Sequence, residues 1–146
     1  MSKHRILIID DERPMTRMVR LNLEATGRYE VREENASANA LLTARDFRPD
    51  LVLLDVIMPG ADGGEIAARF KIDPVLSRIP IVFLTATVSP REAGKGGLMS
   101  AGMKFLAKPV SLATLVGCIE EFLGKPVIAA SPETAVAKPG GEKPAC

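Results

Sequence analysis

Polar residues that could carry out chemistry occur directly after four short, mainly apolar runs of the chain. The runs span residues 6–9, 51–54, 81–84 and 103–107, and the residues that follow them are Asp10, Asp11, Asp55, Thr85 and Lys108. Acids, a hydroxyl and a cation in one place suit phosphoryl transfer, which depends on positioning and on neutralising negative charge. In this chemistry Asp55 attacks phosphorus as the nucleophile, while Thr85 and Lys108 hold the transferred group.

The three acids would repel one another in a shared crevice, and this repulsion disfavours their charged forms unless a cation joins them. Ligation by oxygen alone, without His or Cys, selects a hard ion. The best fit is Mg2+, with Mn2+ as the alternative, held by Asp10, Asp11 and Asp55 together with water and phosphate oxygens.

Each of these residues also has an ordinary structural interpretation. Asp11 and Glu12 precede a proline and could cap a helix or interact with its dipole. Lys108 could be a solvated lysine, and Thr85 could be a hydrogen-bonding residue at a strand end. Asp55 is harder to explain in this way, because an acid placed after buried apolar residues costs free energy without a purpose.

The apolar runs are typical of strands that helices cover on both faces, as in parallel sheets. Strand-like and helix-like segments alternate five times, with strands expected over residues 5–9, 28–33, 51–54, 81–84 and 103–107. This pattern predicts an α/β fold with a five-stranded parallel sheet, doubly wound and flavodoxin-like, with five helices. The strand order 2-1-3-4-5, with the second and fifth strands at the edges, places Asp10 and Asp11 beside Asp55.

Helices are expected where apolar residues recur at helical spacing between start and stop signals. The first three cover about residues 14–26, 38–47 and 65–70, the second being capped by Asn35 or Ser37. Residues 90–101 predict a weak fourth helix because they contain three glycines, each costing about 1 kcal/mol in a helix interior. Ser111 caps the last helix, which stops at Gly124.

The composition excludes several classes of partner. Among 146 residues, 19 Lys and Arg against 18 Asp and Glu give a net charge of +1, so no overall field favours nucleic acid or an anionic membrane. The first apolar run is too short for a signal peptide or a membrane-spanning helix, so a cytoplasmic protein is expected. One domain is expected over residues 1–124, and residues 125–146 have the composition of a disordered tail or linker.

These motifs resemble those of response-regulator receiver domains of bacterial two-component signalling, and the chain looks like a stand-alone example. The resemblance covers about residues 3–124 and rests on four motifs, Ile-Ile-Asp10-Asp11-Glu, Leu-Leu-Asp55-Val-Ile-Met-Pro-Gly, Phe-Leu-Thr85-Ala and Phe-Leu-Ala-Lys108-Pro. It implies a signalling switch rather than an enzyme. The phosphoryl group would come from a phosphohistidine on a sensor histidine kinase or a histidine phosphotransfer protein.

The resemblance also implies roles for individual residues. Asp11 would bind Mg2+ directly, Asp10 would act partly through water, and the backbone carbonyl of Ile57 would complete the protein ligands. The peptide bond between Lys108 and Pro109 would be cis.

The same resemblance implies a conformational switch and residues that set the rate of dephosphorylation. Thr85 would move toward the phosphoryl group and Phe105 would turn inward. These motions would change the face formed by the fourth helix, fifth strand and fifth helix. That face would contact an unknown downstream protein or form a homodimer. Phe105 is otherwise an ordinary core residue. Ile57 and Thr87 occupy the positions that guide the water of dephosphorylation, and an apolar Ile57 predicts a long-lived phosphorylated state.

Other classes fit less well. An aspartyl-phosphate phosphatase needs a second acid two residues after the nucleophile, where this chain has Ile57. A flavin-nucleotide binder of the same topology needs a phosphate-binding loop after the first strand, where Asp10 and Asp11 would repel phosphate. A degenerate receiver that serves only as a binding scaffold is disfavoured because the expected site residues are all present.

Overall fold

The protein is built around one central sheet. The structure is a computed structural model that describes residues 3–86, 98–100 and 103–124. The sheet has six strands in the order β2-β1-β3-β6-β8-β7. Their bounds are Tyr29–Glu34 for β2, His4–Ile9 for β1, Leu51–Asp55 for β3, Ile81–Thr85 for β6, Met103–Ala107 for β8 and Leu98–Ser100 for β7. The first five are parallel, and β7 pairs with β8 in the antiparallel direction.

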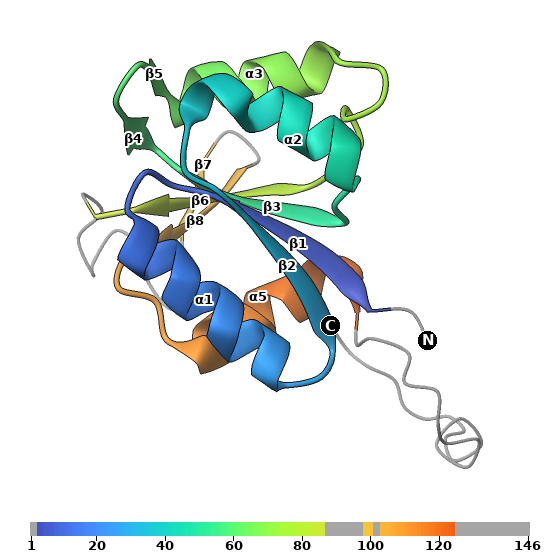
Figure 1. The fold of residues 1–146 in the computed structure, drawn as a ribbon, viewed down its shortest axis with the longest axis vertical. Coiled ribbons are helices and arrows are strands. Elements are labelled where there is room, and N and C mark those ends of the chain that lie inside the picture. The colour runs from blue at the N-terminus through green and yellow to red at the C-terminus, as the bar shows by residue number, and fades with distance from the viewer. Residues whose placement is uncertain (1–2, 87–97, 101–102, 125–146) are drawn as a thin grey trace.

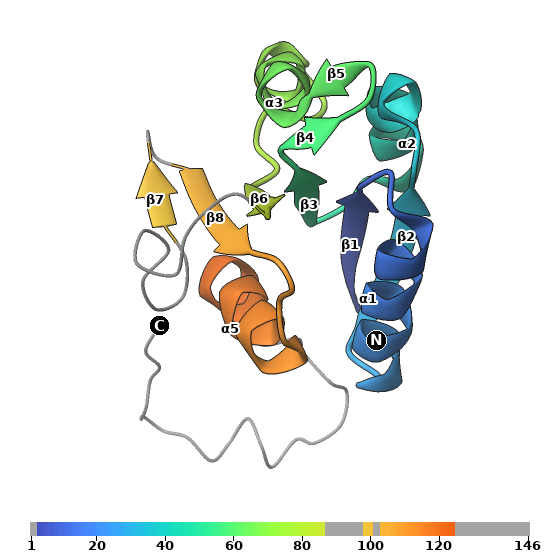
Figure 2. The same ribbon diagram turned by 90° about the vertical axis from the view of Figure 1, so that its left-hand side faces the viewer.

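Helices cover both faces of the sheet. Helices α1 (Arg13–Ala25) and α5 (Leu112–Leu123) lie on one face, and α2 (Ala40–Phe47) and α3 (Gly63–Ile72) lie on the other (Figures 1 and 2). A 3-10 turn, η1 (Ser37–Asn39), leads into α2, and a hairpin of β4 (Ile57–Met58) and β5 (Ala61–Asp62) precedes α3. Among the described residues, no helix has the length and apolar character to cross a membrane.

The burial of the strands explains why their sequences are so apolar. Every residue of β3 and β6 is buried. Alternate residues of β1 point to opposite faces, so Ile6 and Ile8 pack with α1 and α5, while Leu7 and Ile9 pack with α2 and α3. Two hydrophobic clusters result, one under each pair of helices.

The predicted strand order is confirmed for the five parallel strands, but two expectations at one edge are wrong. Residues 98–100 form β7 rather than part of a helix, and the rest of the expected fourth helix lies outside the described residues. The fifth parallel strand, β8, is therefore interior, because β7 covers its outer side. Leu98–Ser100 precedes β8 by two residues, the spacing of a hairpin, and such a short strand has no periodic signal.

Helix starts agree only in part with expectation. Ser111 does cap α5, since its Oγ accepts a hydrogen bond from the backbone N–H of Thr114 at 3.1 Å. Neither Asn35 nor Ser37 caps η1 or α2, because both side chains bind elsewhere. Helix α3 begins earlier than expected, at Gly63, and Asp62 is its cap. The tail expected over residues 125–146 lies outside the described residues.

Candidate functional site at the carboxyl edge of the sheet

Four neighbouring strands deliver their following residues to one edge of the sheet. Strands β1, β3 and β6 run toward the left of Figure 1, where β1 leads into α1 and β3 leads toward the β4–β5 hairpin. Asp10 follows β1, Asp55 ends β3, Thr85 ends β6 and Lys108 follows β8. In open α/β sheets this edge is where ligands bind.

The three acids predicted to share a site do lie together. One carboxylate oxygen from each of Asp10, Asp11 and Asp55 lies within 4.8 Å of the other two. Asp10 is fully buried, Asp55 is 5% exposed, and Asp11 is exposed to solvent. Such an all-oxygen cluster, open on one side, suits a hard divalent cation that keeps part of its water.

One oxygen of Asp10 is available to such a cation. Its Oδ1 accepts a hydrogen bond from the backbone N–H of Glu12 at 3.0 Å. Its buried Oδ2 lies 2.8 Å from Nζ of Lys108, which is an ion-pair distance, yet it receives no hydrogen bond of ordinary geometry from the part of the chain that the structure describes. A buried carboxylate oxygen in this condition fits a metal ligand.

Lys108 provides the positive charge of the site. Its Nζ lies 2.8 Å from Oδ2 of Asp10, 3.1 Å from Oδ1 of Asp55 and 3.3 Å from Oε1 of Glu12. Burial lowers the pKa of Lys108, but the attraction of the Asp10 and Asp55 carboxylates outweighs it and raises that pKa above its ordinary value. The lysine therefore remains a cation at neutral pH.

Asp55 has the opposite balance. Burial raises its pKa, the hydrogen bond from Lys108 lowers it, and the negative charge of Asp10 raises it again, so that the pKa lies above the ordinary value of 3.8. The charged form is thus disfavoured until a further cation arrives.

A pocket of about 450 Å³ opens above these groups. Acidic, apolar and cationic side chains line it, namely Asp11, Glu12, Asp55, Ile57, Met58, Pro59, Thr85, Ala86 and Lys108. Asp55 is accessible from this pocket, which has room for a hydrated ion and a small anionic group.

The loop after Asp55 packs tightly against it. The N–H of Gly63 donates to the carbonyl of Val56 at 2.6 Å, and a Cβ on Gly63 would overlap the backbone carbonyl oxygen of Asp55. On the other side of the hairpin, Oγ of Ser37 donates to the carbonyl of Pro59 at 3.1 Å. The side chain of Ile57 is 63% exposed at the pocket.

The residues expected to switch lie on the adjacent strands β6 and β8. Thr85 is 2% exposed, and its backbone carbonyl accepts from the N–H of Lys108 at 2.9 Å. Phe105 is half-buried and stacks on Phe83 with ring centroids 4.9 Å apart. The peptide bond between Lys108 and Pro109 is cis, as expected. Thr87 lies outside the described residues.

Sequence reasoning overlooked two neighbours of the site. Glu12 was expected only near the helix start, but it also pairs with Lys108. No role was predicted for Gly63, which begins α3 eight residues after Asp55. A glycine at this place in the sequence is a signal for a turn, but it does not reveal the close contact with the backbone of Asp55.

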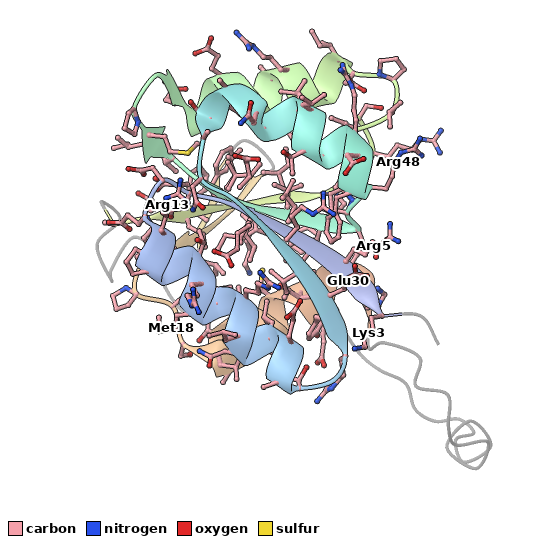
Figure 3. The ribbon with its side chains drawn as sticks, in the orientation of Figure 1. Lys3, Arg5, Arg13, Met18, Glu30 and Arg48 are labelled. Atoms are coloured by element: carbon pink, nitrogen blue, oxygen red, sulfur yellow. The ribbon has the colours of Figure 1, made fainter. Side chains whose placement is uncertain are left out.

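Charges at the opposite end of the sheet are paired with one another. Nε of Arg5 lies 3.6 Å from Oε1 of Glu30. Figure 3 shows Arg5, Glu30 and Arg48 at one end of the sheet. Arg13, at the start of α1, lies at the other end, which carries the site. The ion pair between Arg5 and Glu30 thus lies at the opposite end of the sheet from the acidic cluster.

Known proteins share this sequence and fold. The model of the response regulator receiver domain matches residues 6–120. The phosphate regulon transcriptional regulatory protein PhoB of Pseudomonas aeruginosa is 39% identical over 119 residues, which are 81% of this chain and 51% of PhoB. The response regulator PleD of Caulobacter vibrioides is 39% identical over 106 residues, which are 73% of this chain and 23% of PleD. The chain thus spans about half or less of these relatives.

A solved structure agrees with them. That of the chemotaxis protein CheY4 of Vibrio cholerae superposes with a TM-score of 0.70 at 27% identity, covering 83% of this chain and 99% of CheY4. The match over residues 6–120, together with the parallel sheet and the acidic cluster at its edge, shows that this chain belongs to the response regulator receiver domains, which are phosphorylation-activated signalling switches.

Proposed function

We propose that Asp55 accepts a phosphoryl group from a phosphohistidine on a sensor histidine kinase or a histidine phosphotransfer protein, in a reaction that requires Mg2+. The observation that carries the proposal is the convergence of the oxygens of Asp10, Asp11 and Asp55 within 4.8 Å, beside the ammonium group of Lys108. Burying Asp10 and Asp55 beside each other costs free energy that the single charge of Lys108 offsets only in part, and a divalent cation at this place would offset the rest.

The chemical step uses groups that already face the pocket. An oxygen of the Asp55 carboxylate attacks phosphorus and forms a P–O bond, while the bond from phosphorus to the donor nitrogen breaks and its electron pair stays on the imidazole. Lys108 can turn from its resting ion pairs toward the oxygens of the transferred group. The hydroxyl of Thr85 supplies a further hydrogen bond to them.

The acids have a separate task. Receiver domains bind Mg2+ at an acidic pocket, and the chain's own groups that fit this role are Asp10, Asp11 and Asp55. The backbone carbonyl of Ile57, a residue that lines the same pocket, is proposed as the last protein ligand. When bound, Mg2+ neutralises charge on the acids and on the phosphoryl oxygens. The buried Oδ2 of Asp10, which lacks a hydrogen bond among the described residues, supports this assignment.

The signal would leave through protein contacts. Thr85 and Phe105 lie on adjacent strands, and the backbone of Thr85 contacts Lys108 directly. A shift of these residues would be felt on the face that β8 and α5 form, where a downstream protein or a second copy would bind. The side chain of Phe105 is only half-buried, so a further part of its surface could still become buried if the ring turned inward.

The test is the intact mass of the protein after incubation with a small acyl phosphate, with Mg2+ and with EDTA. We expect one phosphoryl adduct that requires Mg2+ and that is absent from an Asp55→Asn variant. Asp46→Asn is the matched control, because that exposed acid pairs with Arg32 on the surface, and it should be labelled like the parent. Absence of an adduct in the folded parent would overturn the proposal in favour of a scaffold that works without phosphorylation.

A further inference from the structure

Asn35 joins the segment after β2 to the acids that follow β1. Its Nδ2 donates to the backbone carbonyl of Asp10 at 2.8 Å and to Oγ1 of Thr16 at 3.0 Å. An amide nitrogen carries two hydrogens, so these bonds use both of them. Because a carbonyl can only accept, the side chain of Asn35 must present its nitrogen, not its oxygen, to Asp10.

Thr16 holds the other side of this amide. It is fully buried in α1, and its Oγ1 accepts from Asn35. The one hydrogen of this hydroxyl can go to Oε1 of Glu33, at 2.8 Å, or to the backbone carbonyl of Arg13, at 3.1 Å. With either acceptor Oγ1 remains an acceptor for Asn35, so the side chain of Asn35 has an anchor apart from the three acids.

Asp11 depends on its backbone for its position. Its side chain is exposed, and no hydrogen bond to its carboxylate occurs within the described residues. The preceding residue is held twice, because the N–H of Asp10 donates to the carbonyl of Glu34 at 3.1 Å and the carbonyl of Asp10 accepts from Asn35. That carbonyl belongs to the planar peptide that joins Asp10 to Asp11. The bond from Asn35 therefore restrains the peptide from which the Asp11 side chain projects.

We infer that Asn35 is a positioning residue of the cation site: through the Asp10 carbonyl it holds the carboxylates of Asp10 and Asp11 in the geometry that binds a divalent ion. The inference rests on the proposed function, because it takes the acidic cluster to be that ion's site. Groups that orient metal ligands commonly change metal affinity by about 10- to 100-fold when they are removed. Loss of Asn35 should therefore weaken binding of the ion without removing any ligand.

Metal binding tests this directly, without a phosphodonor. Isothermal titration with Mg2+, and the loss of the free Mn2+ signal in electron paramagnetic resonance, give dissociation constants for the full chain. We expect Asn35→Ala to raise both by about 10-fold. Asn39→Ala is the control, because Asn39 is exposed nearby and makes no capping hydrogen bond; its constants should stay within about twofold of the parent.

A second variant separates position from charge and covers failure of Asn35→Ala to fold. Asn35→Asp keeps the size of the side chain, loses both donors and adds a negative charge near the acids. Added charge alone would strengthen cation binding, so weaker binding in Asn35→Asp follows only from lost positioning. Binding as tight as in the parent, in either folded variant, would overturn the inference.

The Mg2+ dependence of labelling by acyl phosphate supplies an independent measurement. In Asn35→Ala the half-saturating Mg2+ concentration should rise, while the rate at saturating Mg2+ stays within about twofold of the parent, because Asp55, Thr85 and Lys108 are untouched. A fall in the saturated rate with unchanged half-saturation would contradict positioning of the ion. If the parent itself binds no ion, the proposed function fails together with this inference; if the parent binds and either folded variant binds as tightly, only this inference fails.

Discussion

Nζ of Lys108 lies 3.1 Å from Oδ1 of Asp55, and the same nitrogen lies 2.8 Å from Oδ2 of Asp10. One ammonium group thus offsets two carboxylates that are almost removed from water. Any anion that arrives at Asp55 competes with both carboxylates for this lysine, and any cation that arrives competes with the lysine for the carboxylates.

Replacing Lys108 with Met keeps most of the stem and removes the charge. Asp10, fully buried, then lacks a counter-charge, and we expect the metal-free protein to lose about 3 kcal/mol of stability. Mg2+ should restore more stability to the variant than it adds to the parent, because the lysine no longer competes with it. Urea unfolding in EDTA and in excess Mg2+ measures both effects.

Lys104→Met is the matched control for that experiment. Nζ of Lys104 pairs with Glu121, whose side chain is 57% exposed, at 3.2 Å. The Lys104 side chain is 12% exposed, like that of Lys108, but the carboxylate that it would leave behind lies in solvent, so this change should cost no more than about 1 kcal/mol. Equal losses in the free energy of unfolding of the two variants would show that Lys108 does not offset an electrostatic cost at Asp10 and Asp55.

Asp55→Asn should stabilise the metal-free protein at neutral pH. Burial, opposed by the hydrogen bond from Lys108 and reinforced by Asp10, raises the pKa of Asp55 above 3.8. A carboxyl with a raised pKa binds a proton more readily in the folded than in the unfolded chain, so stability is lost as the pH rises from 3.8 through the folded pKa. The gain from the neutral side chain should be largest above that window and shrink as the pH falls toward 3.8.

Urea unfolding in EDTA across this pH range measures the difference between variant and parent. Asp46→Asn, which changes an acid whose side chain is 75% exposed, should show no comparable trend. Lower stability of Asp55→Asn than of the parent at neutral pH would show that the charged Asp55 carboxylate does not destabilise the metal-free fold.

Gly63→Ala should disturb the loop that follows Asp55. The added methyl group would overlap the backbone carbonyl of Asp55, and relief of such an overlap costs about 1–3 kcal/mol. Gly117→Ala is the opposite case, because no atom lies within 4 Å of a Cβ built at this position in α5. It should add about 0.5–1 kcal/mol by helix propensity. Thermal unfolding of the two variants checks the contrast, and similar shifts in both would refute the close contact at Gly63.

Ile57→Asn should shorten the lifetime of phosphorylated Asp55. The side chain of Ile57 is 63% exposed and lines the pocket, and an amide at this place can orient a water molecule that an alkyl group cannot. We expect severalfold faster loss of the adduct, followed by intact mass after the donor is removed. Ile72→Asn changes an 81% exposed isoleucine at the end of α3 and should leave the decay unchanged. Equal decay of the Ile57→Asn variant and the parent would count against control by this position.

The sequence predicted those parts of the fold that repeat or that are buried. Runs such as Leu51–Leu54 are buried on both faces, and the parallel order of five strands follows from them, so the meeting of Asp10 with Asp55 could be predicted. Strand β7 could not be predicted, since a three-residue strand takes its structure from its neighbour β8. Asn35 was expected to cap a helix, but its partners lie across the fold. Local sequence cannot show that the Asp10 carbonyl and the Thr16 hydroxyl both accept hydrogen bonds from the Asn35 side chain, which draws that side chain away from a helix cap.

The order of the strands also governs when the chain becomes able to receive a signal. Asp10 and Lys108 come from strands at the two ends of the described sequence, and all the parallel pairings between them join distant segments. Such pairings form slowly, because the entropy of closing a long loop is lost before the strand contacts can stabilise the chain. A chain emerging from the ribosome lacks Lys108 until nearly all of the domain has been made. The complete site therefore forms late in synthesis, and an incomplete or misfolded chain lacks the arrangement of charges that the proposed phosphorylation requires.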